Sequence, residues 1–244
     1  MESRPPSRIP PNQERLQQSG HTGHAGHAPT YRRCDRALPV SGLSDPDVAQ
    51  IVAQFDKLGV SQEVRPGLLT KIAAGELPDS DSGIVQAVTV VRSTSAGNAV
   101  TRSTYPDGSV SVASWPAASS PLVRTGVTPM AITGCAKVYN HGQNAWSNCK
   151  VAWDAATWSG SYYLSYMSFG NVTSVIGPYS IVSGGIGASA ASVVVNNGGG
   201  VGQIGWARFQ MGQSINILGI PTYRTVGFDL KVPDSGPTLS SFTG

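Results

Sequence analysis

Charged residues are scarce in this chain of 244 residues. Lys, Arg, Asp and Glu make up 13 % of the sequence, against about 25 % in an average soluble domain. The formal net charge is only +3, and the Lys and Arg residues form no basic stripe. Because a nucleic-acid-binding surface needs clustered cations to contact phosphates, we expect no nucleic-acid partner.

Long apolar runs are also missing. The chain has no stretch of about 18 apolar residues, so the sequence predicts no transmembrane segment. Residues 1–39 contain no apolar segment of the kind that a cleavable signal peptide carries, so no signal peptide is visible in this chain. Two Pro-Pro pairs and little apolar material predict a disordered leader over 1–42.

Motifs for catalysis or metal binding are absent from most of the chain. We find no G-x-S-x-G turn, no paired Cys and His and no P-loop. His21, His24 and His27 have a spacing that can gather imidazoles around a metal ion, but the Gly and Pro around them favour a solvated segment. We therefore predict no catalytic residue, no metal site and no cofactor, and we leave enzyme activity open while favouring its absence.

A short helical hairpin is predicted over 43–82. Ser44 or Asp45 can cap a first helix with Pro46 in its first turn, and Gly59 ends it. Apolar residues at helical spacing form its buried face: Val48, Ile51, Val52, Phe55 and Leu58. A second short helix follows, beginning near Ser61 or Pro66 and ending at Gly75.

The rest of the sequence predicts a mainly β protein. Residues 83–125 form a β-hairpin segment and a linker, because Asp107 and Gly108 supply a hairpin turn between two β-like runs. Seven or eight short strands with no helical period fill 126–235, which predicts an antiparallel β-sandwich there. The expected strands are 130–139, 147–154, 160–168, 172–182, 189–196, 201–211 and 222–232, and residues 236–244 are expected to form a loose tail.

Two of the three cysteines flank a predicted hairpin. Cys135 and Cys149 are separated by strand, turn and strand, so they can meet across it. A disulfide closing a loop of this length stabilises by about 3 kcal/mol in the chain-entropy model. We favour a Cys135–Cys149 disulfide over two buried free thiols.

Aromatic residues are dense between 139 and 166. Trp146, Trp153 and Trp158, with the adjacent Asp154, can line a carbohydrate site, because aromatic faces stack on sugar rings. The same indole rings can instead pack in the core of a sandwich. The sequence does not say which of them face outward.

Several short segments resemble a group of secreted actinobacterial proteins of uncharacterised function. These segments are LTKIAAGELPDS at 69–80, YPDGSV at 105–110, Gly134 with Cys135, and NCKV at 148–151 with Trp153 nearby. The resemblance covers about 65–235. It implies export and an all-β C-terminal domain, and it carries no known catalytic residues.

Together these observations favour a non-enzymatic, extracellular binding protein whose partner is a polysaccharide or the cell wall. One alternative is a secreted hydrolase without a recognisable motif. A second alternative is a membrane-active, pore-forming toxin, because the nearly charge-free hairpin at 183–213 has arms about as long as a membrane-crossing strand.

Overall fold

A computed structural model of the protein describes residues 42–117, 135–140, 143–169, 171–233 and 235–244. Residues 1–41 of the predicted leader, the histidines within it and most of the predicted linker lie outside the described residues. All the described residues belong to one compact unit.

Three helices come first in this unit: α1(Asp45–Leu58), α2(Arg65–Ala73) and the single turn α3(Asp79–Ser82). Ser44 caps α1 with its side chain, and Gly59 ends the helix in the left-handed conformation, as its sequence predicts. The predicted helical hairpin is therefore confirmed.

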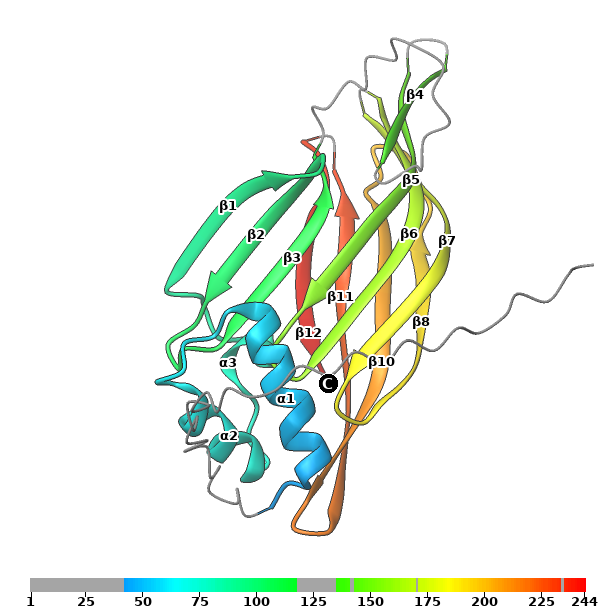
Figure 1. Cartoon of the computed structure of the whole chain (residues 1–244). Helices are drawn as coiled ribbons and strands as arrows, with labels where there is room; N and C mark the ends of the chain where they lie inside the picture. Colours follow the sequence, from blue (N-terminus) through cyan, green and yellow to red (C-terminus); the bar gives the residue numbers. More distant parts are fainter. Residues whose placement is uncertain (1–41, 118–134, 141–142, 170, 234) are drawn as a thin grey trace, which may run out of the picture. The chain divides into compact units, whose positions relative to one another are not determined.

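Twelve strands follow in the described part of the chain: β1(Thr89–Ser95), β2(Asn98–Thr104), β3(Val110–Pro116), β4(Ala136–Asn140), β5(Gln143–Asp154), β6(Trp158–Phe169), β7(Val172–Gly185), β8(Ala188–Asn197), β9(Gly199–Val201), β10(Gly205–Ile217), β11(Ile220–Val232) and β12(Thr238–Thr243). They form two antiparallel sheets, which confirms the predicted fold class. The larger sheet has eight strands in the order β1-β2-β3-β5-β6-β7-β9, with β4 paired to β5. The smaller sheet has the order β12-β11-β10-β8, and Figure 1 shows the two sheets in separate layers.

The main hydrophobic core lies between the two sheets. Alternation along β6 turns Trp158, Tyr162 and Leu164 inward, and none of them is exposed to solvent. Tyr162 contacts Phe209 of β10 and Phe228 of β11, with ring centroids 6.4 and 5.6 Å away. Burying side chains of this size stabilises a fold by about 1.5–3 kcal/mol each.

A second, smaller core joins the helices to the sheets. Ile51 and Phe55 of α1 and Leu68 of α2 pack with residues from β3 and from two strand-connecting turns, including Val110 and Ile186. The hairpin of β2 and β3 also continues the larger sheet through pairing of β3 with β5. The helical hairpin and the β-hairpin are thus built into the sandwich by packing and by strand pairing.

The C-terminal segment corrects one expectation. Residues 236–244 were expected to be loose, but Thr238–Thr243 form β12, which pairs with β11 over the whole of its length. Leu239 packs against the main core, and the alternation of small polar and apolar side chains suits an edge strand. The expectation was wrong because the pairing partner is what orders these residues.

The predicted disulfide is present. Cys135 and Cys149 are bonded, and their Cα atoms are 4.0 Å apart. The bond lies where β4 pairs antiparallel with β5. No helix among the described residues is long and apolar enough to span a membrane.

Candidate functional site

The three tryptophans expected to line a sugar site lie inside the sandwich. Trp158 is fully buried, and Trp146 and Trp153 are 8 % and 7 % exposed. Trp146 stacks on Tyr166 with ring centroids 4.8 Å apart, and the ring centroids of Trp153 and Phe228 are 6.4 Å apart. Their ring faces are therefore not available to a surface ligand, which corrects the sugar-site interpretation in favour of core packing.

Asp154, the fourth residue expected at that site, has a structural partner. Its Oδ1 atom accepts a hydrogen bond from Lys57 Nζ at 2.6 Å. Close by, Gln54 of α1 donates to the carbonyl oxygen of Ala155 at 2.9 Å. Asp154 therefore helps to hold α1 against the end of β5.

A different aromatic pair lies on the outer face of the larger sheet. Tyr163 of β6 and Tyr179 of β7 are cross-strand partners, and their rings stack with centroids 5.7 Å apart. Tyr179 is 44 % exposed. Its hydroxyl donates a hydrogen bond to Asn148 Oδ1 of β5. This pair is fixed in place from two neighbouring strands while one ring remains open to solvent.

Three irregular backbone positions surround this pair. Between the Tyr163–Tyr179 pair and the next pair on either side, β7 has one residue more than β6. These two stretches of β7 contain Gly177 and Ser180, at φ 41° and 50°. A bulge in β5 contains Asn148 at φ 57°. Left-handed conformations at non-glycine residues are costly, and bulges often re-aim side chains beside binding sites. The bulges direct Asn148 and Tyr179 toward each other.

Tyr179 is only partly covered by its neighbours. Tyr163 covers one face of its ring, and β9 pairs with β7 only at Val172, Thr173 and Ser174. In the described part of the chain no further strand is paired beside Tyr179. Lys150, directly opposite Tyr163 on β5, is exposed and adds a cation to the same face.

The sequence predicts one of the two tyrosines of this surface. Ser159, Ser161 and Ser165 alternate with buried apolar residues along β6, so they mark its outer face. Tyr163 is in phase with these serines, which predicts an outward ring. Tyr179 has no such signal, because the two bulges break the alternation of β7.

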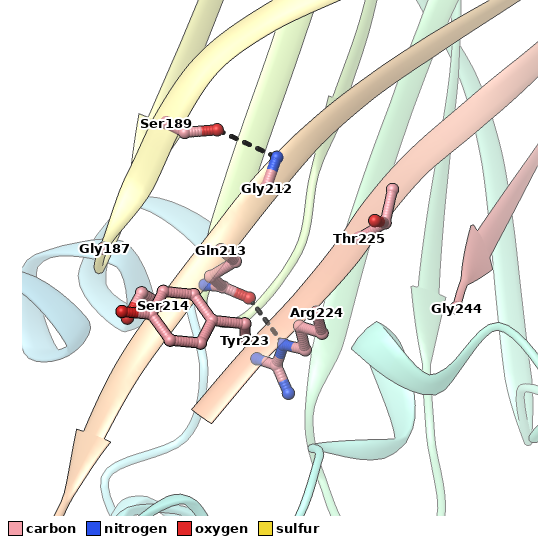
Figure 2. A pocket seen from close by; sticks show the side chains of 9 residues that line it. All are labelled: Gly187, Ser189, Gly212, Gln213, Ser214, Tyr223, Arg224, Thr225 and Gly244. Carbon is pink, nitrogen blue, oxygen red and sulfur yellow. Dashed lines mark hydrogen bonds between the residues drawn. The ribbon is translucent and has the colours of Figure 1, made fainter. Parts of the chain in front are cut away.

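A pocket of about 490 Å³ lies elsewhere, between the turn after β7 and strands β10 and β11. Its lining includes Gln213 and Arg224, which are cross-strand partners, and the exposed ring of Tyr223. Figure 2 shows the hydrogen bond from Arg224 Nε to Gln213 Oε1, which measures 2.8 Å. Arg224 Nη2 donates to Thr157 Oγ1 at 3.1 Å.

A buried carboxylate lies close enough to this arginine to interact with its charge. Asp81 is fully buried and accepts hydrogen bonds from the backbone N–H groups of Ala156 and Thr157 at 2.9 and 3.1 Å. The hydroxyls of Thr157 and Ser80 also donate to it. Thr157 therefore links Asp81 to Arg224 through its hydroxyl group.

Burial shifts the pKa values of Asp81 and Arg224 in the direction that favours the uncharged form of each group. Desolvation raises the pKa of Asp81, and the hydrogen bonds from Thr157 and Ser80 offset it only in part. Desolvation likewise lowers the pKa of Arg224, and the charge of Asp81 opposes that shift. The two groups thus stabilise each other's charged forms.

Candidate metal ligands do not gather around these features in the described part of the chain. Within the residues that the structure describes, no three His, Cys, Asp or Glu side chains lie close enough to hold a metal ion. His21, His24 and His27 are outside that part of the chain. Among the described residues, the surfaces with distinctive geometry are the Tyr163–Tyr179 face and the Arg224 pocket.

Compared with protein-family models, curated proteins and solved structures, the chain matches none of them.

Proposed function

We propose that this protein is a non-catalytic binding module that acts outside the cytoplasm and takes a polysaccharide as its ligand. The contact surface is the Tyr163–Tyr179 face. The observation that carries this proposal is the half-exposed, fixed ring of Tyr179 on the outer face of the larger sheet.

The chemistry of an exposed tyrosine supports this ligand class. An aromatic face stacks on the apolar face of a sugar ring, and the ring has few rotatable bonds to immobilise on binding. Asn148 and Tyr163 already hold Tyr179 in one orientation. A preorganised contact loses less conformational entropy when ligand binds.

The surface beside the pair also suits a long, neutral polymer. Ile176 and Val182, on the same strand, are 59 % and 60 % exposed. Lys150 is the neighbouring cation on β5. A low-charge surface of this kind favours contacts with sugar rings over contacts with a highly charged polymer.

The Cys135–Cys149 disulfide supports the extracytoplasmic location. Disulfides form and persist in oxidising compartments and are rare in the cytosol. Here the bond lies one residue from Asn148, so it also restrains the bulge that contacts Tyr179.

Co-sedimentation of the oxidised full chain with insoluble bacterial cell wall, chitin and cellulose tests the proposal. We expect the wild type to bind at least one of these polymers and the Tyr179→Ala variant to bind about tenfold more weakly or worse, which corresponds to a loss of about 1.4 kcal/mol. Tyr179→Phe keeps the ring and is expected to retain most of the binding. Tyr223→Ala is the matched control, because Tyr223 is 76 % exposed on the other sheet.

Two results would contradict the proposal. One is that the wild type binds none of the three polymers. The other is that the Tyr223→Ala variant loses binding while the Tyr179→Ala variant keeps it, which would place the contact on the smaller sheet.

A further inference from the structure

Strand β8 leaves one edge of the smaller sheet without a partner. It is the last strand in the order β12-β11-β10-β8, and among the described residues no strand pairs with its other side. Its ten residues, ASAASVVVNN, include no charged residue and no proline. An open edge of this kind presents backbone N–H and C=O groups that can pair with a further strand.

The other free edges in the described part of the chain are each protected in a way that β8 is not. Strands β4 and β9 have only five and three residues. Arg92 places a charge in the middle of β1. Beyond its short pairing with β9, strand β7 is interrupted by two bulges and by Pro178. Gly83 lies against β12, where an added Cβ atom would be 3.1 Å from the Cα atom of Phe242. Short strands, charges, prolines, bulges and covering segments all prevent association between edges.

The side chains of β8 are only partly covered by its own sandwich. Ala191, Val193 and Val195 are paired with buried residues of β10 and pack against the main core, yet all three remain partly exposed. On the outer face of the strand, Val194 is 44 % exposed. A strand added beside β8 would remove more of this apolar surface from water and extend the core.

The sequence of β8 is complementary to a second copy of itself. In an antiparallel pair centred on Val193, this residue meets its own copy, and Ala191 lies opposite Val195 of the second copy. On the outer face, Ser192 lies opposite Val194 of the second copy. Residues directly opposite each other in an antiparallel pair share a face of the sheet, so this register keeps the inner faces of both copies on the same side. Because β8 carries no charge, the pairing brings no like charges together.

We propose that this chain forms a two-fold symmetric dimer in which β8 pairs antiparallel with β8 of a second copy, centred on Val193. The two four-stranded sheets would then form one continuous sheet. Main-chain hydrogen bonds supply the affinity, and the inner stripe of Ala191, Val193 and Val195 sets the register. A single strand edge is a small interface, so we expect a dissociation constant on the order of 10 µM. The interface contains no residue of the Tyr163–Tyr179 face and does not depend on the function proposed for that face.

Sedimentation velocity of the oxidised full chain, from about 1 µM to about 500 µM, tests the dimer. We expect a reversible equilibrium between monomer and dimer. Val194→Lys adds a charge at an exposed position of the open edge and is expected to weaken dimerisation about tenfold or more. Val90→Lys is the matched control, because Val90 is 47 % exposed on the edge strand β1, and this variant is expected to dimerise as the wild type does. Melting curves check that both variants fold.

Cysteine cross-linking tests the register. In a Cys34→Ser background, chains that carry Ser192→Cys are mixed with chains that carry Val194→Cys. The Cβ atoms of opposite residues are about 4.5–5.5 Å apart, whereas diagonal neighbours are about 7–8 Å apart. A disulfide needs a Cβ separation of about 3.5–4.5 Å. The mixture is therefore expected to form disulfides between chains about tenfold faster than either chain does alone.

Three outcomes would overturn the inference. A chain that stays monomeric up to about 500 µM would have no such interface with itself, and β8 would then be open to an extended segment of another protein. Loss of dimerisation in Val90→Lys but not in Val194→Lys would place the interface on β1. Cross-linking of either single-cysteine chain as fast as the mixture would contradict the pairing centred on Val193. The Tyr179→Ala variant is expected to dimerise whether or not the wild type binds a polymer, so the dimer and the polysaccharide surface can fail separately.

Discussion

Asp81→Asn is the substitution that tests most sharply how the helical segment is joined to the sandwich. Asp81 lies in α3, and both of its carboxylate oxygens accept hydrogen bonds from Ala156 and Thr157 in the turn between β5 and β6. Asparagine has nearly the same shape but presents an NH₂ group where one of these oxygens stood. That group would face an N–H and a hydroxyl that both need an acceptor.

The cost follows from the contacts that are lost. Hydrogen bonds to a charged group contribute about 1.5–3 kcal/mol each, and at least two of them are removed. Asparagine also avoids the cost of burying a charge, which returns part of this loss. We expect a net decrease of about 3 kcal/mol in the free energy of unfolding, and a melting temperature lower by about 6–12 °C for a chain of this size.

Chemical denaturation followed by tryptophan fluorescence measures this change, because the core indoles become exposed on unfolding. Burial raises the pKa of Asp81 above its ordinary value of 3.8. As the pH rises above 4, Asp81 therefore ionises at a lower pH in the unfolded chain than in the folded chain. Because the folded chain binds the proton more tightly, the free energy of unfolding of the wild type falls with rising pH, relative to that of Asp81→Asn. The difference between the two proteins should narrow from pH 4 toward neutrality.

Asp45→Asn is the control, since Asp45 is exposed in the first turn of α1. We expect it to change stability by less than about 1 kcal/mol. A loss below about 1 kcal/mol for Asp81→Asn, or a difference that widens with rising pH, would refute this account of the network.

Three further predictions concern the sandwich. Reducing the disulfide should lower the free energy of unfolding by about 3 kcal/mol, measured by denaturation with and without reductant; no change would contradict a stabilising role. Gly160→Ala places a Cβ atom 2.4 Å from the buried ring of Phe209 and should cost about 1–3 kcal/mol, whereas Gly198→Ala meets no neighbour and should be nearly neutral; equal effects would disprove the packing argument. Burial raises the pKa of the Tyr162 and Tyr166 phenols above 10.0, so above pH 10 the unfolded chain loses protons that the folded chain keeps, and stability should fall by up to about 1.4 kcal/mol per pH unit for each phenol. Alkaline difference spectra of the folded protein should accordingly lack the ionisation signal of two tyrosines. Ionisation of all tyrosines before the protein unfolds would contradict this.

Local signals in the sequence predict much of the fold. Ser44, Pro46 and Gly59 define both ends of α1, and the Asp107 and Gly108 turn marks the β2–β3 hairpin. β12 could not be predicted in the same way. Its order comes from pairing with β11 rather than from its own short run of small polar residues.

The candidate sites depend on contacts between distant segments. Asp81 and Thr157 are 76 residues apart, and no local pattern links them to Arg224. The dense aromatic run suggested a surface, but strand alternation turns its tryptophans inward and leaves Tyr163 outside. The outward position of Tyr179 depends on two bulges in β7 that the sequence does not predict.

Tyrosine nitration of the polymer-bound protein, read by mass spectrometry, tests most directly whether the Tyr163–Tyr179 face is the contact surface. The account predicts that a co-sedimenting polysaccharide protects Tyr179, and to a lesser extent Tyr163, while Tyr223 on the other sheet is nitrated as fully as in the free protein. Protection of Tyr223 in place of Tyr179, or equal nitration of all three in the bound and free protein, would contradict it.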